Sequence, residues 1–192
     1  MNKLRVSFSI LKLWQQGRIE DCVNSYFKLK QLTNPYMEEG KKWDTKVNEH
    51  VLKNSCLPQE FGGETLKLPK VQEKWEMDFE GYTLVGVPDI VDEPTLLEIK
   101  TGGSKDSGDY AMDFQIGIYL LLGELLNKNL EKALILHYNQ FTKELDRTLI
   151  WNTPFERERA KNYILTLSPE IMTFFTEKDL FSKYLLTSQV TI

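Results

Sequence analysis

Residues 86–103 read GVPDIVDEPTLLEIKTGG and place Asp89, Glu98 and Lys100 in or beside apolar runs. Charged side chains are rarely buried unless they are paired or bind a metal ion. Glu98 and Lys100 interrupt the run LLEIK, where a buried strand would otherwise carry only Val, Leu and Ile. This stretch therefore predicts either a charged turn that faces solvent or a site built on two strands.

The two apolar runs of this stretch are separated by a short turn, DEP, and predict a β-hairpin whose acidic turn faces solvent. Successive side chains of a strand point to opposite faces, so Glu98 and Lys100 share one face. Pro88 removes a ladder donor and favours a break in the pleat, which re-aims the neighbouring Asp89. Because the turn folds the two strands together, we expect Asp89 to lie beside Glu98.

Such a pair of carboxylates has a definite chemistry. Two carboxylates at one point, with a backbone carbonyl nearby, form an all-oxygen site that suits a hard divalent cation such as Mg²⁺ or Mn²⁺. A neighbouring lysine, Lys100, can orient or help to deprotonate an attacking water, or steady a phosphate. A charged hairpin tip remains the alternative, but it does not account for Glu98 and Lys100 inside an apolar run.

The composition is that of an ordinary globular protein, with 192 residues, 41% hydrophobic and 27% charged. The net charge of −4 argues against a protein that coats nucleic acid nonspecifically. No apolar run approaches the roughly 20 residues of a membrane span, and the first residues lack the apolar core of a signal peptide. We therefore expect an intracellular, cytoplasmic protein that does not contact a membrane.

The periodicity of apolar residues predicts helices, a hairpin, a long helix, a strand and further helices. This order is typical of an α/β protein in which a small mixed β-sheet is flanked by helices. We expect one domain over residues 1–192, with a helical segment over 1–57, a core over about 58–145 and a second helical segment over 146–192. The expected elements are helices over 6–16, 18–30 and 37–56, short strands over 66–82, the hairpin strands 82–91 and 95–100, a flap-like loop over 102–108, a helix over 110–127, a strand over 132–141 and helices from about 155.

The hairpin also carries a family signature. Pro88-Asp89, eight intervening residues and then Glu98-Ile99-Lys100 resemble the motif of the PD-(D/E)xK nucleases. Thr101-Gly102 follows, and Gln115 and Tyr119 form a Gln-x-x-x-Tyr motif on the expected long helix. These additions narrow the resemblance to the RecB-like branch, which includes Cas4-like exonucleases.

A further motif of this branch, usually Gly-x-x-x-His, lies on an upstream helix. Residues 40–44 read GKKWD, so Asp44 stands where a histidine is common. A carboxylate there can still bind a hard metal ion, but Glu49 or His50 on the next turn can serve instead. The resemblance thus covers about residues 40–119 and leaves the upstream ligand open.

The resemblance implies a restriction-endonuclease-like core and a Mg²⁺- or Mn²⁺-dependent deoxyribonuclease. In this family the acids hold the metal ion and the lysine acts in catalysis, while the glutamine contacts the site and the tyrosine touches nucleic acid or braces the lysine. The metal ligands that it implies are Asp89, Glu98, Ile99 through its carbonyl, and Asp44 or Glu49; the catalytic residues are Asp89, Glu98, Lys100, Gln115 and Tyr119.

The cysteines separate this chain from some members of the branch. Cas4-like relatives with an iron–sulfur cluster use four cysteines, one near the N-terminus and three near the C-terminus. This chain has Cys22 in a suitable place, but no cysteine follows Cys56. Four thiolates cannot be assembled from two, so we expect no iron–sulfur cluster, as in some viral and mitochondrial exonucleases of this kind.

The biological role that follows is an exonuclease that acts on DNA single strands or duplex ends in recombination, repair or replication, with a helicase or recombination partner. The resemblance leaves open a virus-encoded protein that acts in its host cell, and it leaves the oligomeric state open. The alternative is a non-catalytic nuclease-like module that binds nucleic acid or a protein. The intact set of Asp89, Glu98 and Lys100 argues against this alternative, whereas Asp44 keeps it open.

Overall fold

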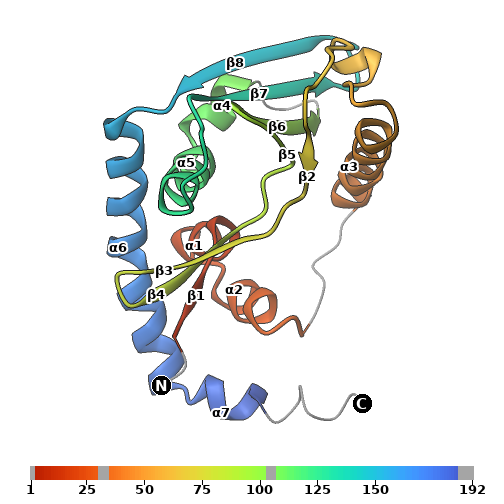
Figure 1. The fold of residues 1–192 in the computed structure, drawn as a ribbon. Coiled ribbons are helices and arrows are strands. Elements are labelled where there is room, and N and C mark those ends of the chain that lie inside the picture. The colour runs from red at the N-terminus through yellow and green to blue at the C-terminus, as the bar shows by residue number, and fades with distance from the viewer. Residues whose placement is uncertain (1–2, 30–34, 103–106, 186–192) are drawn as a thin grey trace.

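Two small mixed sheets, rather than one, carry the strands of this α/β protein (Figure 1). The structure is a computed structural model and describes residues 3–29, 35–102 and 107–185. The three-stranded sheet has the order β1 (Arg5–Val6), β4 (Tyr82–Gly86), β3 (Trp75–Phe79). The five-stranded sheet has the order β2 (Lys70–Val71), β5 (Ile90–Asp92), β6 (Thr95–Gly102), β7 (Lys132–Asn139), β8 (Leu145–Trp151).

The second sheet arises because the run expected as one strand over 82–91 is interrupted. Its first half, β4, pairs with β1 and β3, whereas its second half, β5, forms the expected hairpin with β6. Pro88 stands in the connection between them, where a missing backbone N–H costs no ladder hydrogen bond. The connection carries Asp89 from one sheet to the other.

The helices occupy most of the places predicted for them. The long helix expected over 110–127 is divided, however, because Asp113 and Phe114 separate α4 from α5. Asp113 is held by Lys12 at 2.6 Å, and the Phe114 ring stacks on Tyr163 with a centroid distance of 3.9 Å. The described helices are α1 (Phe8–Gln15), α2 (Ile19–Tyr26), α3 (Pro35–Asn54), the 3₁₀ turn η1 (Gln59–Phe61), α4 (Ser107–Met112), α5 (Gln115–Leu125), α6 (Pro154–Glu177) and α7 (Leu180–Leu185).

The structure also differs from the sequence-based expectations in both segments expected to be helical and in the loop expected over 102–108. Strand β1 falls within residues 1–57, and β8 extends into residues 146–192, although both segments were expected to be helical. Within the loop expected over 102–108, residues 103–106 lie outside the described residues, and Ser107 begins α4. No helix of the described residues is long and apolar enough to cross a membrane.

The acids of the hairpin turn do not simply face solvent. The Asp92 carboxylate accepts backbone N–H bonds from Lys67 and Leu68, and that of Glu93 accepts one from Asn129. Both side chains therefore fix neighbouring segments to the hairpin, which the exposed-turn interpretation missed.

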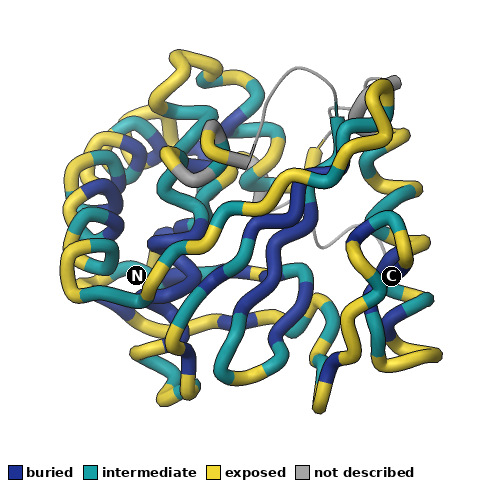
Figure 2. The backbone as a smooth tube through the Cα atoms, turned by 90° about the horizontal axis from the view of Figure 1, so that it is seen from above, coloured by how far each residue is buried: buried dark blue, intermediate teal, exposed yellow. Residues whose placement is uncertain are grey.

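The five-stranded sheet separates two hydrophobic cores, and this arrangement decides which face carries the charges. Leu97 and Ile99 of β6 face a core shared with Val47 and Val51 of α3. Leu96 of β6 faces the larger core, which includes most of α5. Figure 2 shows the longest buried stretches in the middle of the structure, with exposed residues around them. By alternation, the side chains of residues 98 and 100 point to the α5 face.

Gly86, at the end of β4, permits a close approach between β4 and α5 in the larger core. A Cβ atom at this position would lie 2.8 Å from Leu122 Cδ1 and 2.9 Å from Tyr119 Cε1. Carbon atoms do not pack at such distances without a shift of one partner. The missing side chain therefore lets the Tyr119 ring lie against the backbone just before Asp89.

We predict that Gly86→Ala lowers the free energy of unfolding by roughly 1–3 kcal/mol, the usual cost of overpacking a core. Gly40→Ala is the matched control, because a Cβ at Gly40 would meet no atom within 4 Å and alanine favours the helix. Urea or thermal unfolding would measure both variants. Equal stability of Gly86→Ala and the wild type would show that this close contact does not constrain the fold.

Candidate active site

Asp89 and Glu98 meet where the connection between the sheets enters the hairpin. The backbone N–H of Ile99 donates a hydrogen bond of 2.8 Å to Asp89 Oδ2. This bond fixes the Asp89 carboxylate against the strand that carries Glu98. In a strand the N–H and C=O of one residue point to the same neighbour, so the Ile99 carbonyl is directed to the Asp89 side as well.

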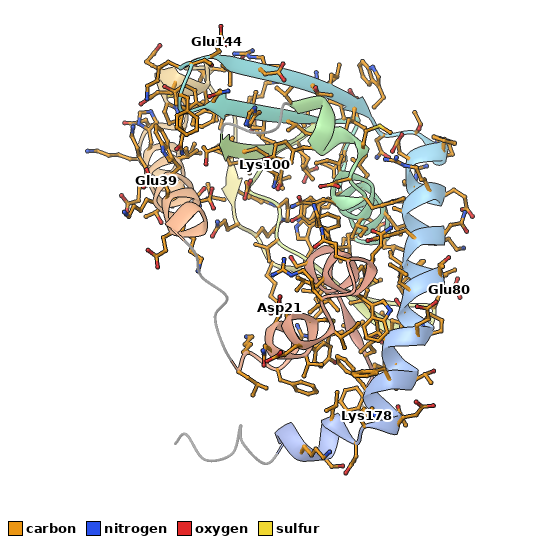
Figure 3. All side chains as sticks on the ribbon, turned by 180° about the vertical axis from the view of Figure 1, so that it is seen from behind. Asp21, Glu39, Glu80, Lys100, Glu144 and Lys178 are labelled. Atoms are coloured by element: carbon orange, nitrogen blue, oxygen red, sulfur yellow. The ribbon has the colours of Figure 1, made fainter. Side chains whose placement is uncertain are left out.

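Glu98 and Lys100 form a largely buried ion pair on the α5 face of β6. The Lys100 Nζ atom lies 2.6 Å from Glu98 Oε1. The Glu98 side chain is 3% exposed and that of Lys100 is 22% exposed, so solvent screens the pair only to a limited extent. In Figure 3, Lys100 lies among the interior side chains, whereas Glu39 of α3 lies on the outside. The alternation that the sequence predicts brings the two charges together.

The two motif residues of α5 complete this network. Gln115 donates from Nε2 to Glu98 Oε1 at 2.7 Å and to the Tyr119 hydroxyl at 3.0 Å, and its Oε1 accepts from Lys100 at 3.1 Å. The Tyr119 hydroxyl donates to the Val87 carbonyl at 3.1 Å. Residues four apart on a helix share a face, which is why both reach the site. Tyr119 thus holds the segment before Asp89, and Gln115 holds Glu98 and Lys100.

One buried oxygen of the site has no hydrogen-bond partner among the described residues. Glu98 Oε2 is almost inaccessible, yet nothing in the described ranges donates to it. A buried carboxylate oxygen without a partner is costly, and a cation beside it would remove the cost. The neighbouring donors, the Asp89 carboxylate and the Ile99 carbonyl, are all oxygens, so the set fits a hard divalent cation.

The described residues contain no cluster of three His, Cys, Asp or Glu side chains close enough to hold a metal ion together. Mg²⁺ does not require such a cluster, because it is usually bound by one or two carboxylates and keeps several waters. The pair of Asp89 and Glu98 with one carbonyl meets this lower requirement.

The charges of the site shift one another's pKa values. Burial is the largest effect on Asp89 and raises its pKa well above the ordinary value, and the nearby Glu98 carboxylate raises it further. For Lys100, burial by itself lowers the pKa, but the carboxylates of Glu98 and Asp89 outweigh it and the pKa is raised. Lys100 is therefore an ammonium ion at neutral pH, suited to stabilising negative charge.

The upstream helix α3 contributes one acid near the site. Burial raises the pKa of Asp44, with opposing effects from Lys100 and Glu98, which places its carboxylate within electrostatic range of both. Glu49 is exposed, and His50 lies 3.5 Å from the Cys56 sulfur. Of the three candidates for an upstream ligand, the structure brings only Asp44 toward the pair.

Two aromatic residues near the site, Tyr110 and His137, were not among the predicted site residues. The Tyr110 ring of α4 has its centroid 5.6 Å from Lys100 Nζ and 5.6 Å from the centre of the His137 ring. His137 is buried on β7 and stands opposite Lys100 in the parallel register. That register could have indicated His137, but no signal in the sequence pointed to Tyr110, because α4 was merged with the next helix.

Comparisons with known proteins agree on the family and fold. A model of the PD-(D/E)XK nuclease superfamily matches residues 9–183. The structure is similar to the protein SSO0001, with a TM-score of 0.56 and 16% identity over 86% of this chain and 77% of the other. It is also similar to LHK-Exo, an alkaline exonuclease from Laribacter hongkongensis, with a TM-score of 0.54 and 10% identity over 94% of both chains. A structure of LHK-Exo in complex with dAMP gives a TM-score of 0.50 and 10% identity over 91% of this chain and 93% of the other.

No curated protein sequence matches the chain. At identities of 10–16%, the structural neighbours show a shared fold and leave substrate and reaction to other observations.

The raised pKa of Asp89 predicts that its charge destabilises the metal-free protein. A carboxyl group whose pKa is raised by folding contributes most stability below its unfolded-state pKa and loses that stability as the pH rises through the folded-state pKa. Asp89→Asn removes the charge and keeps an oxygen for the Ile99 N–H. In EDTA we expect this variant to melt above the wild type at pH 8, with a difference that shrinks toward pH 4; each 1 kcal/mol corresponds to roughly 2–4 °C.

The control for this prediction is Asp92→Asn, whose carboxylate accepts backbone N–H bonds and lies at the hairpin turn, outside the site. Its melting temperature at pH 8 should equal or fall below that of the wild type. A melting temperature of Asp89→Asn at or below the wild-type value would contradict the proposed repulsion.

Proposed function

The chain belongs to the PD-(D/E)XK nuclease superfamily, and on this premise we propose that it hydrolyses DNA phosphodiester bonds with the help of a divalent metal ion. The proposal is carried by one observation, the buried Glu98 Oε2 atom that lacks a partner among the described residues. Lys100 binds the other oxygen of this carboxylate, and the Asp89 carboxylate lies within its electrostatic range. A buried acid pair of this kind is unfavourable for the fold alone, and a cation together with a phosphate substrate would give it a purpose.

The metal ion that we propose is Mg²⁺ or Mn²⁺, since nucleases of this superfamily generally use such ions. Asp89, Glu98 and the carbonyl of Ile99 would hold it, with Asp44 rather than Glu49 as the further ligand. When bound, the ion would act as a Lewis acid that activates water and offsets charge on the leaving oxygen.

The remaining residues position the acids and supply positive charge to the site. Lys100, an ammonium ion, would donate to a non-bridging phosphate oxygen and stabilise the charge that grows there during hydrolysis. Gln115 keeps Lys100 beside Glu98 through its two hydrogen bonds, and Tyr119 fixes the Val87 carbonyl and hence the position of Asp89. Gln115 and Tyr119 are positioning residues in this proposal, because their polar groups are used within the protein.

We further propose that hydrolysis proceeds from DNA ends or single strands. The support is the resemblance to the RecB-like branch together with the fold shared with an alkaline exonuclease that has been crystallised with dAMP. On the same grounds we propose one nuclease domain without an iron–sulfur cluster, a role in recombination, repair or replication inside a cell, and a helicase or recombination partner.

A cleavage assay tests the reaction and its metal dependence. We expect Mg²⁺ or Mn²⁺ to support degradation of end-labelled linear and single-stranded DNA, EDTA to stop it, and circular duplex to resist it. Asp89→Ala and Glu98→Ala should each abolish cleavage in folded protein, whereas Glu93→Ala, in the same hairpin but outside the site, should leave it intact. Metal-independent cleavage, or wild-type rates in either acid variant, would refute the assignment; metal and DNA binding without any cleavage would favour the non-catalytic module.

Lys100→Met separates catalysis from metal binding. The methionine keeps most of the aliphatic stem but removes the charge, so cleavage should fall by ~10²-fold or more while metal affinity measured by calorimetry does not fall. Lys128→Met is the matched control, because the Lys128 side chain is 17% exposed, lies 2.7 Å from a carboxylate (Glu73) and stands 5.5 Å from an aromatic ring (Trp75). Equal cleavage rates for the two variants would remove Lys100 from the mechanism.

A further inference from the structure

A pocket with several cationic and hydroxyl side chains lies on the three-stranded sheet, away from the carboxylate pair. It has a volume of about 600 Å³ and is lined by residues of β1, α1, α2 and β4 and by the segment before β3. Figure 1 shows these elements next to one another below the five-stranded sheet. Among its described lining residues none is acidic. The polar side chains that matter here are those of Arg5, Lys28, Lys74, Ser7, Ser9 and Ser25.

The pocket has a surplus of positive charge. Arg5 and Lys74 both pair with Glu76, at 3.0 and 2.6 Å, and they share the same oxygen, Oε2. Among the described residues Lys28 has no acidic partner. The lining thus carries three cations, of which two share a single carboxylate. Because the side chains of Arg5 and Lys74 are 50% and 56% exposed, these ion pairs are weak and leave both cations able to bind another anion.

The neutral polar side chains of the pocket include hydroxyls that can donate hydrogen bonds. Ser7 caps α1, where its hydroxyl accepts the Ile10 N–H, and the first turn of α1 carries no acidic residue. The hydroxyls of Ser9 and Ser25 add further donors at the wall. Arginine, lysine, serine hydroxyls and backbone N–H groups are the groups that bind phosphate oxygens in nucleic-acid complexes. These polar groups suit a phosphate and disfavour a cationic ligand, while Val6, Ile10 and Val85 form an apolar wall beside them.

The pocket lies within reach of the carboxylate pair, because a short segment of the chain joins them. Val85 lines the pocket, and Asp89 follows four residues later, so their Cα atoms are at most roughly 14 Å apart. On the other side, Lys74 is two residues beyond Gln72, whose N–H donates to the Asp89 carbonyl at 2.9 Å. A nucleic-acid strand with one phosphate at the carboxylate pair can therefore place another, a few nucleotides away, in the pocket.

We propose that this basic pocket, with Arg5, Lys28 and Lys74 as its cations, binds a phosphate group of the DNA strand that is cleaved at the carboxylate pair. The inference rests on the proposed function in taking DNA as the ligand. The phosphate is either a terminal monoester or an internal phosphodiester, and both present anionic, non-bridging oxygens to the pocket.

The test compares three single variants, Arg5→Gln, Lys28→Gln and Lys74→Gln, with a control that removes an equal charge elsewhere. Lys161→Gln serves as the control, because Lys161 pairs with Glu80 at the tip of the β3–β4 hairpin, at the opposite end from Lys74. Fluorescence anisotropy would measure binding of a labelled single-stranded oligonucleotide in EDTA, where hydrolysis does not interfere, at several salt concentrations. Thermal melting would verify the fold, to which exposed ion pairs contribute little.

We expect each pocket variant to weaken binding by about three- to tenfold, as for the removal of one exposed charged group from an interface. The slope of log affinity against log salt should fall by ~0.7 for each phosphate that is no longer neutralised. Lys161→Gln should bind as the wild type does. Wild-type binding by all three pocket variants, or an equal decrease in Lys161→Gln, would overturn the proposal.

Oligonucleotides with a 5′-phosphate, a 3′-phosphate or hydroxyls at both ends separate the two phosphate sources. If the pocket binds a terminal phosphate, the wild type should bind one of the phosphorylated oligonucleotides more tightly, and the pocket variants should lose this extra affinity. If it binds an internal phosphate, the variants should bind all three oligonucleotides more weakly by the same factor. Cleavage of the same DNA in Mg²⁺ distinguishes failure of this inference from failure of the proposed function. If the pocket variants bind more weakly but the wild type does not cleave, the proposed function is refuted and the pocket inference stands. If the wild type cleaves but the variants bind normally, the pocket inference is refuted and the proposed function stands.

Discussion

Two like charges held together at the end of a buried hairpin are the constraint on which this structure depends. Asp89 and Glu98 repel each other, and burial makes the repulsion stronger than it would be in water. The fold tolerates the pair because the Ile99 N–H binds one carboxylate and Lys100 with Gln115 binds the other. The compensation is incomplete, and the remaining imbalance supports the proposal that a cation binds here.

The rest of the fold can be understood as support for this pair. The chain passes from one sheet to the other at Pro88, and that transfer, rather than the hairpin alone, sets the direction of Asp89. Tyr119 anchors the transfer from α5 through the Val87 carbonyl, and its ring fits only because Gly86 has no side chain. Tyr119 of α5 thereby fixes the position of the Asp89 carboxylate, by binding the backbone just before Asp89.

The sequence predicted the features of the site that depend on local periodicity. Alternation along β6 placed Glu98 and Lys100 on one face of the strand. The four-residue spacing placed Gln115 and Tyr119 on one face of a helix, and this helix face contacts that face of the strand. It did not predict the second sheet, because a strand that ends at Gly86 and one that begins at Ile90 read as one β-rich run. The break at Asp113 and Phe114 was missed for a similar reason, since it depends on contacts with Lys12 and Tyr163, which are remote in sequence.

The buried charges of the carboxylate pair and the exposed cations of the basic pocket differ in how strongly solvent and salt screen them. The carboxylate pair and Lys100 are largely shielded from water, so salt screens them weakly, and their net negative charge repels a phosphate until a cation is present. Arg5 and Lys74 are half exposed, so the attraction that we propose between them and a DNA strand should fall as the ionic strength rises. In this proposal the exposed cations attract the strand and the buried acids carry the chemistry. The two need not interfere with each other, because the segment from Val85 to Asp89 separates them and limits the distance between them.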